Sequence, residues 1–207
     1  MPDSIRKYIK RVTTELADIV CDFAAALKAA DSSRPIDNPK YKPGIGPHRE
    51  DVAIALALTL MKLGKPERYG TAVTGQCYPE KSTKCDLVLP TEWAIELKLV
   101  RPFYDNGTED QYWVKNLLYP YAGHESAAGD AVKVRDSAFT TKTAVLIFGF
   151  EHMPAKIDLE PAITAFELIA REILGVCLGD RQHSRQIDLV HPVHRQLRVD
   201  GWEVLRD

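Results

Sequence analysis

The sequence lacks the features that mark membrane-spanning and secreted proteins. No apolar run approaches the roughly 18 residues of a membrane span, and the first residues are charged, without the apolar stretch of a signal peptide. The four cysteines form neither a C-x-x-C pair nor a compact disulfide frame, which predicts reduced thiols. These absences favour a cytoplasmic protein that does not contact membranes.

A strong charge of one sign is also absent. The formal net charge is −2, so any nucleic-acid surface must be a local patch rather than a property of the whole chain. Neither a Walker A pattern nor a G-x-S-x-G elbow occurs, and we see no internal repeat. Hydrophobic residues make up 45% and charged residues 27%, which is ordinary for a globular protein. The length and even composition predict a single domain over residues 1–207.

Hydrophobic periodicity predicts helices on either side of a group of strands. The predicted elements are helices over residues 4–30 and 47–64, strands over 69–73, 85–89 and 93–100, helices over 108–120 and 130–139, a strand over 143–150, and a C-terminal helix (158–175) plus hairpin within 158–206. The hairpin is expected to turn at Asp200-Gly201, and Thr108 with Gln111 resembles a capping box. This order predicts an α/β (α+β) fold with a mixed central β-sheet flanked by helices.

The segment Cys85 to Leu99 carries the strongest chemical pattern. If residues 90–92 form a turn, Asp86 faces Glu96 across a hairpin, and every second residue of both strands is a large apolar side chain. Opposed residues have Cβ atoms roughly 4.5–5.5 Å apart, so the two carboxylates repel each other. A hard divalent cation with oxygen ligands offsets that repulsion. Lys98 lies on the same face and could orient or deprotonate a water, or stabilise charge on phosphorus.

This pattern resembles the PD-(D/E)XK nuclease superfamily, which includes many restriction and repair endonucleases. Asp86 matches the motif aspartate, Glu96 the second acid and Lys98 the lysine. The family's core order of helix, three-stranded meander, helix and strand is followed by residues 47–150, about half of the chain. One departure is Cys85, which stands where the family pattern has proline. The resemblance implies a restriction-endonuclease-like fold and a Mg²⁺ (or Mn²⁺) site.

Several neighbouring residues fit such a site, and each also has an ordinary structural explanation. Glu50 is a candidate third metal ligand, although a carboxylate in the first turn of a helix is stabilised by the helix dipole in any case. Arg49, Lys84 and Lys115 are candidate nucleic-acid contacts, or solvated surface charges. The capping box accounts for Gln111 without catalysis.

Two other patterns favour packing over chemistry. His191 and His194 have a spacing that could serve zinc, but no cysteine pair accompanies them. Tyr112, Trp113 and Tyr119 are expected to pack in the core and on helices rather than to stack on bases.

The sequence thus predicts a metal-dependent nuclease that hydrolyses phosphodiester bonds of nucleic acid, and DNA is the expected nucleic acid. Cutting both strands needs two sites, which favours a homodimer. The alternatives are a non-catalytic nucleic-acid-binding or protein-interaction module of the same fold, and a module of unrelated fold whose hairpin is a solvated surface strand.

Overall fold

One mixed sheet of seven strands forms the centre of the molecule, in the residues that the computed structural model describes (14–36, 40, 42–120 and 125–206). The strands are β1 (Val73–Cys77), β2 (Lys84–Leu89), β3 (Trp93–Val100), β4 (Lys142–Glu151), β5 (Cys177–Leu178), β6 (Gln182–Gln186) and β7 (Gln196–Leu205). Their order is β1-β2-β3-β4-β7-β5, with β6 also paired to β7. Only the β3–β4 pair is parallel among these strands. The predicted α+β class with a mixed sheet is confirmed.

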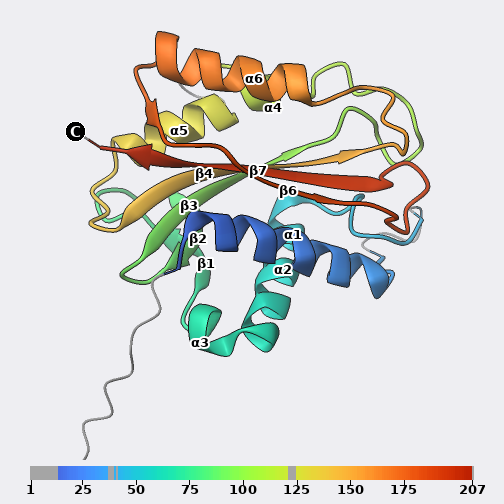
Figure 1. Cartoon of the computed structure of the whole chain (residues 1–207), viewed down its shortest axis with the longest axis horizontal. Coiled ribbons are helices and arrows are strands. Elements are labelled where there is room, and N and C mark those ends of the chain that lie inside the picture. The colour runs from blue at the N-terminus through green and yellow to red at the C-terminus, as the bar shows by residue number, and fades with distance from the viewer. Residues whose placement is uncertain (1–13, 37–39, 41, 121–124, 207) are drawn as a thin grey trace, which may run out of the picture.

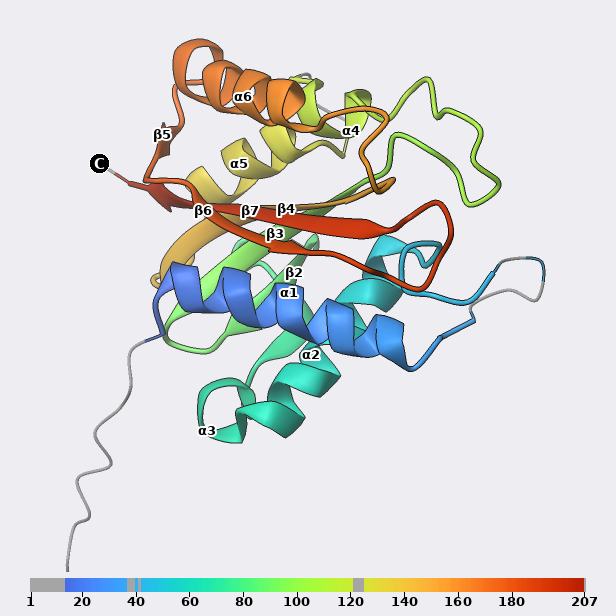
Figure 2. The same cartoon turned by 45° about the vertical axis from the view of Figure 1, so that its right-hand side comes forward.

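Helices cover both faces of the sheet, as Figures 1 and 2 show. One face carries α1 (Leu16–Ser32), α2 (Glu50–Gly64) and α3 (Pro66–Tyr69); the other carries α4 (Lys115–Leu118), α5 (Ala127–Arg135) and α6 (Glu160–Leu168), which continues as a π-helical turn (Ile169–Ile173). None of the helices in the described ranges combines the length and the apolar character needed to cross a bilayer.

The predicted hairpin has the predicted register. Leu89 pairs with Trp93 and Leu87 with Ile95. The turn between the strands places Thr91 at φ 68°, in the left-handed region that a tight connection often needs. Because side chains alternate along each strand, Leu87 and Ile95 point into the core under α1 and α2. The opposite face of β2 and β3 carries the polar residues together with the buried apolar side chains of Val88 and Ala94.

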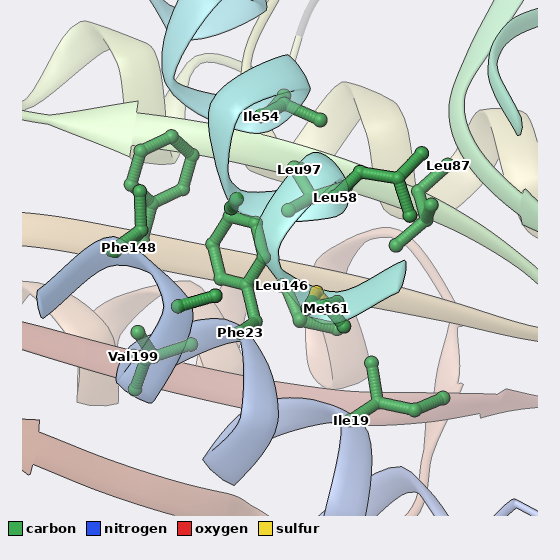
Figure 3. Close-up of a cluster of buried hydrophobic side chains, with 14 of the residues drawn as sticks. Ile19, Phe23, Ile54, Leu58, Met61, Leu87, Leu97, Leu146, Phe148 and Val199 are labelled. Atoms are coloured by element: carbon green, nitrogen blue, oxygen red, sulfur yellow. The ribbon is translucent and has the colours of Figure 1, made fainter. Parts of the chain in front are cut away.

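The core on the α1–α2 side fixes the position of the hairpin. Its side chains come from both helices and from strands β2, β3, β4 and β7, and Figure 3 shows them interleaved. A second apolar cluster lies under α5 and α6 on the other face of the sheet. Full burial of one Leu, Ile, Val, Phe or Met side chain stabilises the folded state by roughly 1.5–3 kcal/mol. The sheet is therefore held from both sides, and its polar residues lie on a rigid support.

The prediction of a C-terminal hairpin is wrong, because residues 196–205 form one continuous strand, β7. Asp200 does not turn the chain, since its carboxylate is buried against Arg198 and His183. Gly201 is required for a different reason: a Cβ there would lie 2.8 Å from the side chain of Val20 and 3.2 Å from that of Leu146. The glycine lets α1 approach the sheet closely.

Other boundaries also differ from the predictions. The helix predicted over 4–30 begins at Leu16, with residues 4–13 outside the described part of the chain. Tyr69 ends α3 instead of starting a strand. Thr108 opens no helix, because its amide and hydroxyl both bind the side chain of Asn106 within a loop. The helix predicted over 130–139 is α5, which spans 127–135. The α-helix predicted over 158–175 spans only 160–168, and its N-cap is Leu159 rather than Asp158.

Candidate active site

A pocket of about 440 Å³ lies on the polar face of the β2–β3 hairpin. We call it the acid pocket. Five acidic and three basic side chains line it, which are Glu50, Asp86, Glu96, Glu125 and Asp130, and Lys84, Lys98 and Lys133. The structure thus brings together all four predicted metal or catalytic residues. If all these groups are ionised, the acids exceed the lysines by two charges.

Asp86 and Glu96 occupy neighbouring strands at the centre of the acid pocket. Asp86 Oδ2 accepts a hydrogen bond of 2.8 Å from the backbone amide of Leu97, which holds this carboxylate against β3. Burial raises the pKa of Glu96 to about 9, and the negative charge of Asp86 adds to the effect. Glu96 therefore carries a proton at neutral pH when no metal ion is bound beside Asp86.

Lys98 lies between two further carboxylates. Its Nζ is 3.3 Å from Glu50 Oε1 and 3.5 Å from Asp130 Oδ2. Burial alone would lower the pKa of Lys98, but the charges of Asp130, Glu50 and Asp86 raise it above its ordinary value. Lys98 is consequently a permanent cation in the acid pocket. In the metal-free site this favours stabilisation of charge on phosphorus over deprotonation of water, two of the roles left open by the sequence.

Glu50 reaches the acid pocket from the first turn of α2. Its Oε2 accepts a 2.5 Å hydrogen bond from the amide of Leu99, while its Oε1 faces Lys98. Burial raises the pKa of Glu50, partly opposed by Lys98. The helix dipole and the strand amide together hold this carboxylate at the end of β3.

Sequence reasoning missed several residues of the acid pocket and its wall, among them Asp130, Lys133 and Tyr78. Asp130 and Lys133 lie one turn apart on α5, and Tyr78 lies in the loop after β1. Lys133 Nζ is 2.6 Å from Glu96 Oε1, and the Tyr78 hydroxyl donates to the same oxygen. Asp130 Oδ2 is buried, and Lys98 Nζ lies 3.5 Å from it. The sequence contained one signal for Asp130 and Lys133, which is their i, i+3 spacing beside small alanines. This spacing indicates a site only once α5 is known to pack on β3.

The donor set has the chemistry that a hard divalent cation requires. All candidate ligands are carboxylate oxygens, and the acidic side chains outnumber the lysines by two. Within the described residues, no three acidic, histidine or cysteine side chains are arranged as a complete metal ligand set. Mg²⁺ typically takes one or two carboxylates and completes its shell with water and substrate phosphate. Asp86 and Glu96 suffice for that pattern.

A second hollow of about 300 Å³ adjoins the acid pocket, and we call it the side pocket. It shares Glu50, Lys98 and Glu125 with the acid pocket. Of the three predicted nucleic-acid contacts, Arg49 lines the side pocket and Lys84 lines the acid pocket. Lys115 lies outside both linings, over the rings of Tyr112 and Tyr119.

The histidine pair takes part in packing, as expected. His194 is buried, its Nε2 lies 3.0 Å from the carbonyl oxygen of Phe103, and burial lowers its pKa to about 3. The rings of His191 and His194 stack with centroids 4.7 Å apart, whereas two ligands of one metal would point their nitrogens at a common centre. The expectation for Tyr112 is wrong, because its side chain is 65% exposed.

Comparison with family models, curated proteins and solved structures gave no match. The interpretation of this site therefore depends on its own geometry and charges. Those features are the facing carboxylates of the β2–β3 hairpin, the buried cation Lys98 and the uncompensated negative charge.

Proposed function

We propose that the protein is a metal-dependent nuclease whose acid pocket binds Mg²⁺ or Mn²⁺ and hydrolyses phosphodiester bonds of nucleic acid, most readily DNA. One observation carries this proposal. Asp86 and Glu96 lie on adjacent strands, with Lys98 two residues further along the same face, in a pocket lined by five acids and three lysines. A divalent cation would displace the proton of Glu96 and balance the two negative charges that are then in excess.

The arrangement of the strands supports the same proposal. α2, the β1–β2–β3 meander, α5 and β4 follow the order of a restriction-endonuclease-like core, and β4 pairs with β3 in parallel. The parallel pairing places the connection that contains α5 over the meander, which brings Asp130 and Lys133 to the hairpin. We therefore propose this fold for the core over residues 47–150.

Each residue of the acid pocket has a distinct part in the proposed reaction. Asp86 and Glu96 would hold the cation, which supplies Lewis acidity toward water and a phosphate oxygen when it is bound. Tyr78 and Lys133 both contact Glu96 Oε1, so they would hold this carboxylate in place for the cation. Lys98 would donate to a phosphate oxygen, where its permanent charge stabilises the negative charge that builds up during attack.

Glu50 and Asp130 are positioning residues in this proposal. Their carboxylates lie on two sides of the Lys98 ammonium group, at 3.3 and 3.5 Å. Held in this way, Lys98 keeps both its charge and its direction without help from the substrate. Preorganised charge of this kind is effective because little reorganisation is needed when the reaction occurs.

A cleavage assay tests the proposal. Supercoiled plasmid and linear DNA are incubated with Mg²⁺, Mn²⁺ or chelator, using wild type, Glu96→Gln and Lys98→Met. We expect metal-dependent cutting that falls by about 10²–10³-fold in both variants, the loss seen when one preorganised charge-stabilising group is removed. Glu160→Gln is the matched control, because Glu160 is a remote carboxylate paired with Arg181 and Arg198.

Two results would contradict the proposal. One is a wild-type protein that cuts no nucleic acid with any of the metals, and the other is wild-type rates in both acid-pocket variants. Calorimetric titration of Mg²⁺ into the same proteins then separates the alternatives. Metal binding lost in Glu96→Gln without any cleavage would favour a non-catalytic member of the fold.

A further inference from the structure

The side pocket is placed to hold a part of the substrate that lies next to the reacting phosphate. Its volume of about 300 Å³ is at the lower end of the range for small-molecule sites, roughly 300–1,000 Å³. Because Glu50, Lys98 and Glu125 line both pockets, a ligand that extends from one reaches the other directly. A nucleic-acid strand with its phosphate at Lys98 would therefore place a neighbouring nucleotide in the side pocket.

Two arginines line the side pocket, and their guanidinium groups are suited to binding phosphate. The guanidinium of Arg101 donates to the backbone carbonyls of Gly46 and His48, at 2.8 and 3.3 Å, which fixes it in the wall. Arg49 is paired with Asp51, but the two side chains are 73% and 69% exposed. Exposed pairs contribute only about 0–1 kcal/mol, so Arg49 can exchange Asp51 for a phosphate at little cost.

Two other side chains of the side pocket suit the edge of a base. Asn116 offers both a donor and an acceptor, and Asp110 offers acceptors. Amide and carboxylate side chains commonly bind the donor and acceptor groups of adenine and cytosine in this way. In a base pair, the Watson–Crick edges are occupied by the opposite base. Because such contacts also bind paired bases in the major groove, the choice of an unpaired base rests on the volume of the side pocket and on the exposed tyrosine rings described next.

Two exposed tyrosines flank Asp110, one of the residues that line the side pocket. Tyr112 is 65% exposed, and its amide donates a 2.9 Å hydrogen bond to Asp110 Oδ1. Tyr104 is 49% exposed and lies beside the same carboxylate, whose charge raises the pKa of the Tyr104 hydroxyl. Lys115 Nζ lies 5.7 Å from the centroid of the Tyr112 ring. Exposed aromatic rings with adjacent cations are the usual platform for unstacked bases.

We propose that the side pocket holds one unpaired nucleotide next to the phosphate attacked in the acid pocket. The substrate is then a single strand, or a duplex in which one nucleotide is displaced from the stack. Asn116 and Asp110 contact the base edge, Tyr112 stacks on the base, and Arg49 contacts a flanking phosphate. This inference rests on the proposed nuclease function and narrows its class of substrate.

The test compares one DNA sequence in three forms: single-stranded, as a blunt duplex, and as a duplex with one unpaired nucleotide. Cleavage is measured with Mg²⁺, and binding is measured with Ca²⁺ by fluorescence anisotropy. We expect wild type to prefer the two forms with an unpaired nucleotide by at least about tenfold, since displacing a paired base requires unstacking energy. Tyr112→Leu and Asn116→Ala should each reduce that preference by about tenfold, whereas Tyr112→Phe should retain it.

A set of single-stranded DNAs with one abasic position each locates the subsite. One position should weaken wild-type binding when its base is removed, and this effect should disappear in Asn116→Ala. Gln186→Ala, a polar change on the distant strand β6, is the control and should leave every ratio unchanged. An RNA of the same sequence shows which sugar is preferred, and stronger binding of either single strand than of the duplex supports the inference.

The outcomes separate this inference from the proposed function. Equal cleavage of the three forms, or an abasic series without a sensitive position, would overturn the side-pocket proposal and leave the nuclease proposal intact. Failure of wild type to cleave any form would instead count against the nuclease proposal. In that case, the Ca²⁺ binding series still shows whether an unpaired base is recognised.

Discussion

The molecule has two clusters of charged side chains on its sheet, and they are built in opposite ways. The acid pocket contains an excess of carboxylates, and burial together with Asp86 raises the pKa of Glu96 to about 9. The second cluster, which we call the arginine network, lies where β6 and β7 meet α6 and consists of Glu160, Arg181, His183, Arg198 and Asp200.

In the arginine network each carboxylate has a cationic partner. Arg198 binds both Asp200, at 2.6 Å, and Glu160, which Arg181 also contacts at 2.8 Å. Although burial opposes it, these guanidinium groups lower the pKa of Glu160 to about 2. A cluster with matched charges stabilises the fold, whereas unmatched buried charge costs stability and is typical of functional sites. The comparison therefore supports the proposal that the acid pocket, rather than the arginine network, is the functional site.

The largest expected difference between the clusters is in stability. Arg198→Met leaves the Asp200 carboxylate, whose side chain is 1% exposed, without its guanidinium, and we expect a loss of about 3–5 kcal/mol in the free energy of unfolding. Lys133→Met should cost less than about 2 kcal/mol, because protonated Glu96 leaves no buried charge behind. Urea unfolding at pH 7 with chelator measures both changes.

The matched control for this stability comparison is an exposed pair. Arg195 and Asp188 have side chains that are 40% and 63% exposed, so Arg195→Met should change stability by less than about 1 kcal/mol. Equal losses in Arg198→Met and Lys133→Met would contradict the distinction between the two clusters.

The pH dependence of stability should differ in sign between the clusters. The pKa of Glu96 is raised in the folded state from an ordinary value near 4.5, so its stabilising effect is complete below 4.5 and is lost as the pH rises toward 9. We expect metal-free wild type to lose about 4 kcal/mol more than Glu96→Gln between pH 5.5 and 8.5. Glu160 has a lowered pKa, so its contribution is lost only as the pH falls toward 2.

Urea midpoints at pH 5.5, 7 and 8.5 with chelator measure this dependence. Glu160→Gln serves as the control and should keep the wild-type slope over this range, because its carboxylate is already ionised there. Parallel curves for wild type and Glu96→Gln would show that Glu96 does not titrate as its surroundings imply.

The smallest expected effect is stabilisation by the metal. A ligand that binds only the folded state raises the free energy of unfolding by about 1.4 kcal/mol at a tenfold excess over its Kd. Addition of Mg²⁺ should therefore raise the melting temperature of wild type and of Glu160→Gln, but not that of Asp86→Asn. A similar shift in all three proteins would place the metal outside the acid pocket.

Local patterns made the hairpin predictable from sequence. Turn length fixes which residues of β2 and β3 face each other, and alternation then assigns each side chain to a face. No information from distant parts of the chain was needed to place Asp86, Glu96 and Lys98 on one side. Lys98 also illustrates the limit of this reasoning, because its role depends on Asp130, a residue of another element.

Contacts between distant segments caused most of the errors. Asp200-Gly201 has the sequence of a turn, but the close approach of Val20 on α1 requires the glycine, and Arg198 accounts for the aspartate. Tyr78 and Lys133 could not be assigned to the site from sequence, because only the fold brings them into contact with Glu96 on β3. Local propensity does not contain this information.

The sharing of Glu50 and Lys98 by two adjoining pockets has a thermodynamic consequence. A cation in the acid pocket and a nucleotide in the side pocket would each act on the same ammonium and carboxylate groups, so their binding free energies are coupled. By linkage, the factor by which the cation changes the affinity for the nucleotide equals the factor by which the nucleotide changes the affinity for the cation. Two titrations, each performed with and without the second ligand, should therefore yield one number.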